Sequence, residues 1–569
     1  MPVPSAGPKR LARQQQLRLL RGLAQEAGWR HLALLSLLSV ISSLLDIAGL
    51  GLAVTLLLGS EEAGESALPW ISDLGLTASL TWLVSLILLR GLMQAQVAIN
   101  RERLRSGFTD HLRRQLLHQV FSASSAQLNQ LGRGDLLALL MADINRSALG
   151  LDQAVRMGQA LLAIALYLAS VLLVGRAAAW PLLLALLATT TAALVQRSGS
   201  WSLGRIQSRL NAALQRTVGD GLHGLKAMRA AAAEPWLLER FAKETAEGRW
   251  LLKERVRRRT YYNAWRDTLV VAIAGLWMLL QEGTLQPDVL TTTLVLAYRA
   301  ASSLNGVVQA RRLCLGNLPG YEALCERRRQ LKPDGLTNRG GTLPEATCLD
   351  VLQQRWSGFS WETQASDASN LGQLRLEQGC LLALTGPSGA GKTSCLDRVC
   401  GLLDEDQSRW RINTGTRVCA LAGPDGARQL HQLIAYAPQN AVLFEASLRD
   451  NLLLGSDQST DEIETWLQRL GLGHLQQRPQ GLDAPMSLAE TPFSGGEVHR
   501  LGLLRAWLRD LPVEILDEPT AFLDAESAQE VRHVIRSRAD ERLVMVSTHD
   551  PDLLALADRV IDLHPDQPG

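Results

Sequence analysis

Several features are scarce or missing in this sequence, and each one narrows the class of protein. All 7 cysteines lie from Cys314 onward without a CxxC pair, so we expect neither a disulfide framework nor a zinc site. Neither sign of charge is in excess, because Lys+Arg 58 against Asp+Glu 56 leaves +2, and no nucleic-acid partner is expected. The first 30 residues are basic and polar, so no cleavable signal peptide is expected.

Length and average composition exclude further classes. A chain of 569 residues is too long for a single small module and predicts at least two large domains. A hydrophobic share of 47% and a mean hydropathy of +0.03 exclude disordered and collagen-like proteins. Averages of this size are typical of a soluble protein, but here the apolar residues are gathered into long runs.

These apolar runs are long enough to cross a bilayer. Leu32–Gly59 carries Asp46 as its only charge, and Thr77–Ile99 carries only Arg90. Four further spans are predicted. Met157–Val195 contains two spans, which are separated around Pro181. The fifth span is Thr268–Leu280, which is short, and the sixth is Leu285–Ala310. We therefore predict an all-α transmembrane domain of six helices.

Charges between the runs predict the orientation of the spans. Lys and Arg are concentrated before residue 32 and within residues 100–156 and 196–267, whereas the connection after Gly59 carries acidic residues only. Basic segments stay on the cytoplasmic side, so both ends of the chain are expected there. The two long basic segments also repeat apolar residues at helical spacing, which predicts helices that continue far into the cytoplasm.

A phosphate-binding pattern marks the second half of the chain. Cys380–Thr385 reads as a short buried strand, and GxxxxGK[ST] follows it at once. Glycines let backbone N–H groups surround a phosphate, the lysine reaches the β- and γ-phosphates, and the threonine can bind Mg²⁺. The expected ATP contacts are Gly386, Ser388, Gly389, Gly391, Lys392, Thr393 and Ser394. An α/β P-loop ATPase domain is predicted.

A second apolar strand, Val513–Leu516, ends in two acids. Asp517 lies where a carboxylate can hold the Mg²⁺ shell, and Glu518 is placed to polarise an attacking water. From about Leu349 to the C-terminus, the order of these motifs resembles that of the ATP-binding cassette (ABC) ATPases. The resemblance implies ATP and Mg²⁺ as cofactors and Glu518 as the catalytic base.

The resemblance also implies roles for other residues. Gln439 matches the Q-loop glutamine, which joins Thr393 and Asp517 around the metal, and His549 matches the catalytic switch histidine. Trp361 falls where the family places an aromatic that stacks on adenine, with an ordinary core tryptophan as the alternative. Ser494, Gly495 and Gly496 match the signature motif, and Asp524 matches the D-loop aspartate.

Six spans ahead of one such ATPase resemble a half-size ABC exporter. The resemblance implies an obligate dimer, because the signature residues of one chain complete the ATP site of the other. A homodimer is favoured over a heterodimer, and membrane lipid surrounds the spans. Residues Gly221–Phe241 resemble the second intracellular loop of such exporters, whose coupling helix contacts the ATPase.

Some positions depart from the family pattern. The signature has Phe493 where leucine is usual and Glu497 where glutamine is usual, and function is expected to survive both. The family's Gly-Glu stretch is not recognisable in residues 487–492. Tryptophan replaces tyrosine at position 361 and retains an aromatic face.

Asp46, Arg90 and Arg299 are charges that lie well away from the ends of their predicted spans. Asp46 and Arg90 are both near the middle of their spans, where an isolated charge is costly, so we predict that they pair. Arg299 in the sixth span has no obvious acid at matching depth. One hypothesis is that Arg299 binds an anionic substrate, and the alternative is that it snorkels or pairs with Asp46.

Together these observations predict an ATP-driven exporter or flippase in the cytoplasmic (inner) membrane, with its ATPase in the cytoplasm. Cargo that is anionic or lipid-linked is favoured, and peptides or small thiols are the alternative. A membrane-tethered regulatory ATPase that moves no cargo is a third hypothesis. The expected domains are residues 1–30 (basic N-terminal segment), 31–328 (transmembrane), 329–345 (linker) and 346–569 (nucleotide-binding).

Overall fold

The computed structural model divides into two compact units. The helical unit holds residues 1–121 and 131–332, and the sheet unit holds residues 122–130 and 333–569. The described residues are 7–57, 76–123, 127–128, 131, 133–175, 180, 184, 200–280, 287–331, 358–363, 373–403, 408–413, 418–477, 479–486 and 493–563.

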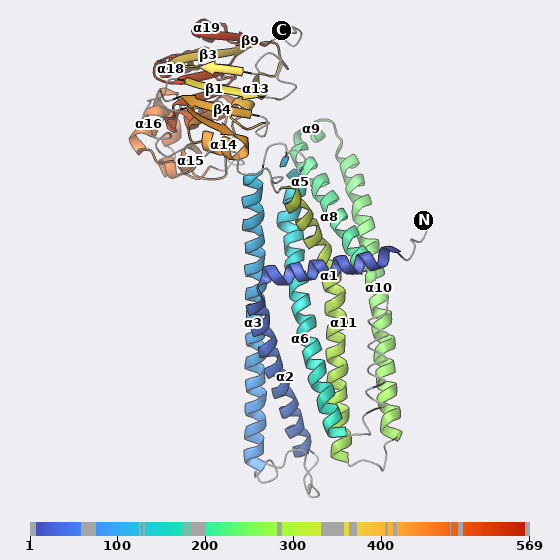
Figure 1. Ribbon diagram of the computed structural model, residues 1–569. Coiled ribbons are helices and arrows are strands. Elements are labelled where there is room, and N and C mark those ends of the chain that lie inside the picture. The colour runs from blue at the N-terminus through green and yellow to red at the C-terminus, as the bar shows by residue number, and fades with distance from the viewer. Residues whose placement is uncertain are drawn as a thin grey trace. The chain divides into compact units, whose positions relative to one another are not determined.

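Long helices dominate the helical unit (Figure 1). They are α1 (Gly7–Ala27), α2 (Trp29–Leu57), α3 (Leu76–Ser122), α5 (Arg133–Ala138), the π-helical turn η1 (Leu139–Asp143), α6 (Ile144–Gly175), α8 (Ser200–His223), α9 (Leu225–Ala230), α10 (Glu234–Leu280) and α11 (Pro287–Gln330). α3 and α10 each continue well beyond their apolar parts. The predicted helical extensions are therefore confirmed in α3, α8 and α10.

Three described helices are long and apolar enough to cross a membrane, over Trp29–Val54, Thr77–Ser122 and Asp135–Val174. The first three predicted spans lie in these helices. The fourth lies mostly outside the described residues, and the fifth and sixth lie in α10 and α11 and stay predictions. Only 6% of the most apolar window of α3 is buried, so its apolar side chains face outward, as they would in lipid.

A buried arginine joins three helices of this unit. Arg146 of α6 is 8% exposed, and its Nη2 donates hydrogen bonds to the carbonyl oxygens of Gly204 and Gly316, both at 3.0 Å. These glycines belong to α8 and α11. A Cβ added to Gly204 would lie 2.3 Å from the carbonyl oxygen of Gly316, so the close approach of α8 and α11 requires glycine here.

We predict opposite effects for two glycine-to-alanine changes in α8. Gly204→Ala forces the helices apart and should destabilise the protein by about 1–3 kcal/mol. Gly219→Ala is the matched control, because a Cβ there has no neighbour within 4 Å, and it should stabilise α8 by about 0.5–1 kcal/mol. Thermal unfolding of the detergent-solubilised chain measures both, and equal melting temperatures for the two variants would contradict the close contact.

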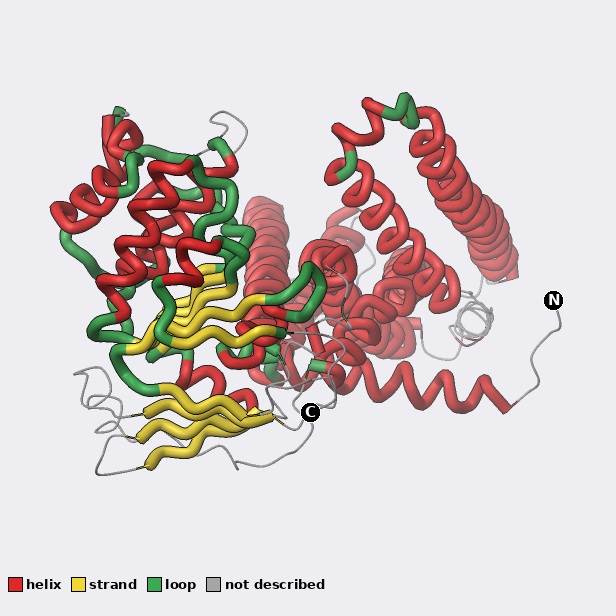
Figure 2. Tube along the Cα trace, turned by 90° about the horizontal axis from the view of Figure 1, so that it is seen from above, coloured by secondary structure: helices red, strands yellow, loops and turns green. Residues whose placement is uncertain are grey.

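The strands of the sheet unit form two groups, drawn in yellow in Figure 2. The strands are β1 (Gly358–Thr363), β2 (Gln373–Leu376), β3 (Cys380–Thr385), β4 (Ser408–Asn413), β5 (Val418–Ala422), β6 (Ile434–Ala437), β7 (Val513–Asp517), β8 (Leu543–Ser547) and β9 (Arg559–Asp562). An antiparallel sheet has the order β2-β1-β4-β5, and a parallel sheet has the order β6-β7-β8-β3-β9.

Helices cover the parallel sheet and complete the unit. They are α13 (Lys392–Val399), α14 (Gly423–Leu430), α15 (Leu448–Leu453), α16 (Thr460–Arg469), the 3-10 turns η4 (Gly473–Gln477) and η5 (Gly481–Asp483), α17 (Gly495–Leu508), α18 (Ala525–Ala539) and α19 (Pro551–Ala555). Every residue of β7 and β8 is buried. Neighbouring strand residues such as Ile515 and Leu516 belong to different hydrophobic clusters, so both faces of the sheet are packed.

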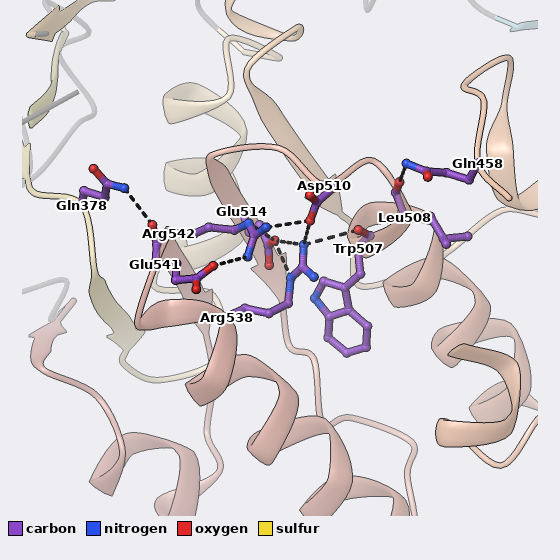
Figure 3. A network of polar contacts seen from close by, with 9 residues as sticks. All are labelled: Gln378, Gln458, Trp507, Leu508, Asp510, Glu514, Arg538, Glu541 and Arg542. Atoms are coloured by element: carbon purple, nitrogen blue, oxygen red, sulfur yellow. Dashed lines mark hydrogen bonds and ion pairs between the residues drawn. The ribbon is translucent and has the colours of Figure 1, made fainter. Parts of the chain in front are cut away.

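A buried polar network fixes the beginning of β7 (Figure 3). Glu514 is fully buried, and its Oε1 lies 2.6 Å from the guanidinium of Arg538. Asp510 Oδ1 accepts from Nη2 of Arg538 at 3.0 Å and from Nη2 of Arg542 at 2.7 Å. Burial raises the pKa of Glu514 although Arg538 opposes the shift, so the carboxylate depends on its cationic partners.

Removing the Glu514 carboxylate should destabilise the sheet unit strongly. Glu514→Ala leaves two mostly buried guanidinium groups short of a partner, which costs about 3–5 kcal/mol and lowers the melting temperature by about 10 °C. Glu541→Ala is the control, because this exposed partner of Arg542 lies at 3.8 Å and contributes about 0–1 kcal/mol. Scanning fluorimetry of the full chain compares the two, and an unchanged melting temperature for Glu514→Ala would disprove the role of the network.

Candidate nucleotide and charge sites

The parallel sheet brings three motif-bearing strands together. β7, β8 and β3 are neighbours, and their carboxyl ends lie at one edge because all three run parallel. Asp517 ends β7, Ser547 ends β8, and Gly386 follows β3. Ligands of open α/β sheets bind at this edge. Motif residues that are far apart in the sequence therefore lie together at one edge of the sheet.

Glycines shape the loop between β3 and α13. Gly386 has φ +143°, and a Cβ there would lie 2.5 Å from the carbonyl oxygen of Leu563. Gly389 and Gly391 have φ of +85° and +86°, in the left-handed region that favours glycine. Ser388 is exposed in the loop, and Ser394 is partly buried in the first turn of α13. This backbone can present its N–H groups to a phosphate.

Lys392 lies across the mouth of this loop. Its side chain is buried, and Nζ donates to the carbonyl oxygens of Gly386 at 2.9 Å and Pro387 at 3.4 Å. Nζ also lies 2.6 Å from Nε2 of His549, which accepts if the ring proton is on Nδ1. A phosphate entering the loop would offer Lys392 a charged partner in place of these neutral acceptors.

Asp517 is the most constrained side chain of the cluster. It is 1% exposed, and its Oδ2 accepts a hydrogen bond from Thr393 Oγ1 at 2.8 Å. Its Oδ1 accepts from Ser547 Oγ. Thr393 and Asp517 therefore meet as predicted, and Ser547 is a partner that the motif analysis missed. Its position at the end of an apolar strand beside the expected switch histidine was the available signal.

Glu518 and His549 lie next to each other at the same edge. The closest atoms, Glu518 Oε1 and His549 Nε2, are 3.6 Å apart. Glu518 has φ +51°, a left-handed conformation held by its N–H, which donates to the carbonyl oxygen of Ser547 at 3.1 Å. A non-glycine residue in this region is strained by about 1–3 kcal/mol. Such strain is typical of functional residues.

The residues predicted to hold Mg²⁺ are partly assembled. Gln439 follows β6, which pairs with β7, and is partly buried, but within the described residues no hydrogen bond joins it to Thr393 or Asp517. The described residues contain no group of three or more His, Cys, Asp or Glu side chains that could hold a metal. Thr393 and Asp517 nevertheless fit Mg²⁺, which typically takes one or two protein oxygens together with phosphates and water.

The signature residues lie at the beginning of α17. Ser494 is its N-cap, and a Cβ on Gly496 would lie 3.0 Å from the carbonyl oxygen of Phe522. Gly495 has open space around its Cβ position. Asp524 caps α18 by accepting from Ser527 N at 2.8 Å, and these hydrogen bonds lower its pKa. The roles of these residues toward a second chain stay predictions.

The expected stacking role of Trp361 is corrected by the structure. Alternation along β1 turns Phe359 and Trp361 inward, and Trp361 is 1% exposed beside the equally buried Trp410 of β4. A ring inside the core presents no face to a ligand. In this structure Trp361 is a core residue, which was the alternative interpretation.

The charges of the predicted spans form one cluster. Asp46 is 4% exposed, and its Oδ1 lies 2.8 Å from Arg90 Nη1, so the predicted pairing is confirmed. Arg299 Nε lies 3.7 Å from Asp46 Oδ2, so the alternative that Arg299 pairs with Asp46 is confirmed. Tyr167 donates to the same Oδ2. No pattern in the sequence predicted Tyr167, because the α2–α6 contact is tertiary.

Comparisons with known proteins agree with this geometry. Residues 370–521 match the ABC transporter family. The chain is 28% identical over 319 residues to the glutathione/L-cysteine transport system ATP-binding/permease protein CydC of Escherichia coli, covering 54% of this chain and 53% of that protein. It is 29% identical over 224 residues to an ATP-dependent lipid A-core flippase of Desulfotalea psychrophila, covering 38% of each chain.

The chain thus spans about half or less of the length of these curated relatives. A solved structure, that of a bacterial Atm1-family ABC exporter with ATP bound, is similar over almost the whole chain. The TM-score is 0.70 at 18% identity, covering 96% of this chain and 94% of the other. The protein therefore consists of an ABC transporter ATP-binding domain fused behind an N-terminal membrane region, and it has the fold of an ABC exporter.

Proposed function

We propose that this chain dimerises in the cytoplasmic membrane and couples ATP hydrolysis to the export of an anionic or lipid-linked cargo. The observation that carries the proposal is the cluster of Lys392, Thr393, Asp517, Glu518 and His549 at one edge of the parallel sheet. The fusion of this cluster to apolar helices supports transport rather than a soluble ATPase activity. The named activities of the similar proteins, export and flipping, support the same class.

Hydrolysis follows from what each group can do. The loop N–H groups and Lys392 bind the phosphates, while Thr393 and Asp517 hold Mg²⁺, which neutralises phosphate charge when it is bound. Glu518 accepts the proton of the attacking water. His549 Nε2 lies 3.6 Å from Glu518 Oε1, so the ring borders this carboxylate, and it can donate toward a phosphate only in the tautomer that carries the proton on Nε2. We place the hydrolysing water within hydrogen-bond distance of the Glu518 carboxylate.

A second copy of the chain fits an apolar surface on α10. This surface lies in the basic segment expected in the cytoplasm and ends three residues before the predicted fifth span. Four large aromatic side chains recur along one side of this helix and are 60–77% exposed: Trp236, Trp250, Tyr261 and Trp265. Apolar side chains gathered in this way mark protein interfaces. We propose a homodimer, in which the signature residues of each chain complete the ATP site of the other, with a heterodimer as the alternative.

The Asp46 cluster supports an anionic cargo. Two guanidinium groups share one carboxylate, so the cluster carries one surplus positive charge. Arg90 and Arg299 are 26% and 37% exposed, and Arg90 Nε is buried without a hydrogen-bond partner in the described structure. A carboxylate or phosphate of the cargo would compensate this charge at the exposed parts of Arg90 and Arg299.

Replacing Glu518 tests the hydrolytic assignment. Glu518→Gln keeps the shape but cannot accept a proton, so the ATPase rate of the purified protein in nanodiscs should fall about 100-fold or more. Glu541→Gln makes the same chemical change on an exposed residue and should leave the rate unchanged. Turnover by Glu518→Gln at the wild-type rate would mean that another group is the base.

Replacing Arg299 tests the cargo site. Arg299→Lys retains the charge but loses the planar pair of donors, so stimulation of the ATPase by an anionic cargo should fall about tenfold. Glutathione, cysteine and a lipid A-core species are the compounds to compare. Arg18→Lys, on exposed α1, should keep full stimulation. If Arg299→Lys responded like the wild type to every compound that stimulates it, a bidentate anion site at Arg299 would be excluded.

A further inference from the structure

The antiparallel sheet has a basic outer face that the nucleotide site does not use. Side chains alternate along a strand, so in β4 the two neighbours of the buried Trp410, Arg409 and Arg411, are exposed. In β2, Arg375 is exposed between two buried leucines. Three guanidinium groups are therefore carried on the outer face of one small sheet.

The strand register places two of these arginines on either side of a serine. Ser360 of β1 is opposite Arg375 of β2 and also opposite Arg411 of β4. Neighbouring strands are about 4.8 Å apart, so the two arginine Cα atoms lie about 10 Å apart with Ser360 between them. Residues that are opposite each other in a sheet share a face, so the three side chains point the same way. Two long side chains can close on one small group beside the Ser360 hydroxyl.

A hollow of about 140 Å³ lies at this place. The described residues that line it are Ser360, Trp361, Glu362, Arg375, Arg409 and Arg411. Trp361 is 1% exposed with its ring in the core, so the side chains that face the hollow are three arginines, one hydroxyl and one carboxylate. None of these residues is on the strands that carry the nucleotide site.

The charges around the hollow do not balance. Three guanidinium groups face one carboxylate, that of Glu362, which leaves a surplus of two positive charges. Glu362 is opposite Arg409 in the sheet, but within the described part of the chain no ion pair joins any of the three arginines to an acid. Like charges gathered on neighbouring strands are destabilising. An anion bound between the arginines would remove this cost.

We propose that the hollow is a binding site for a phosphate group that carries two negative charges. A terminal phosphate carries about −1.5 to −2 charges near pH 7, which matches the surplus. The planar guanidinium groups of Arg375 and Arg411 bind phosphate oxygens in pairs, and the Ser360 hydroxyl donates a further hydrogen bond. Among the described lining residues the only aromatic ring is turned into the core, so the site recognises the phosphate and not a base. This phosphate belongs either to a soluble compound or to a lipid headgroup.

Isothermal titration calorimetry of the full-length protein in phosphatidylcholine nanodiscs measures the binding. Every protein carries Lys392→Ala, which weakens phosphate binding at the loop before α13 and leaves the hollow unchanged. Inorganic pyrophosphate is the soluble probe, and vesicles that contain phosphatidic acid are the lipid probe. Arg411→Gln removes one charge and one pair of donors, so the Kd should rise about tenfold or more. Glu362→Gln removes the opposing charge, so the Kd should fall about twofold to fivefold.

A matched control makes the same change of charge elsewhere in the sheet unit. Arg469→Gln, on α16 and outside the hollow, should leave the Kd unchanged. Because tighter binding cannot result from a loss of folding, Glu362→Gln tests the site even if Arg411→Gln is unstable. Binding of pyrophosphate that depends on Arg411 would support a soluble ligand, and binding of the vesicles alone with the same dependence would support a lipid.

Three results would overturn the site. They are the absence of binding by both probes, equal Kd values for Arg411→Gln and Arg469→Gln, and weaker binding by Glu362→Gln. None of these measurements depends on ATP hydrolysis, so failure of the site would leave the proposed function intact. Loss of ATPase activity in the protein with an intact Lys392 would likewise leave the phosphate site intact.

Discussion

The nucleotide site depends on one buried carboxylate, Asp517. A carboxylate that is 1% exposed is costly unless its oxygens accept hydrogen bonds, and here Thr393 and Ser547 supply them. These partners come from the first turn of α13, which follows the phosphate loop, and from the neighbouring strand. The need to satisfy one charge therefore fixes the relative positions of β3, β7 and β8. Glu518 follows β7 and His549 lies two residues after β8, so the positions of these two strands also determine where both side chains lie.

The membrane region also contains a buried carboxylate that needs partners, but there the partners are charged and the net charge of the cluster is different. Asp46 is also buried, at 4% exposed, but its partners are two arginines and a tyrosine. At Asp517 neutral donors leave a negative charge that a metal can share. At Asp46 the surplus is positive and attracts an anion. Each site thus leaves one charge uncompensated, and the sign of that charge indicates what it can bind.

Local patterns allowed the fold class and most of the candidate ATP site to be predicted. The loop glycines, Lys392 and Thr393 are close in sequence, and the strand that carries Asp517 has a distinct apolar signature. Ser547 and Tyr167 could not be predicted in the same way, because each acts through a contact between distant segments. Trp361 was misassigned because sequence position along β1 does not reveal which face of the sheet the ring occupies. The alternatives for Arg299 could not be separated from the sequence, because depth along one helix does not show which helix lies beside it.

Transport in sealed vesicles tests the central claim, that hydrolysis at this site moves cargo. Inside-out vesicles containing the protein would be given ATP and a labelled anionic cargo, with Glu518→Gln vesicles alongside. The account predicts ATP-dependent accumulation of cargo in wild-type vesicles and none in the variant. Hydrolysis of ATP at the wild-type rate with no accumulation of any cargo that stimulates it would contradict transport and favour a membrane-tethered regulatory ATPase.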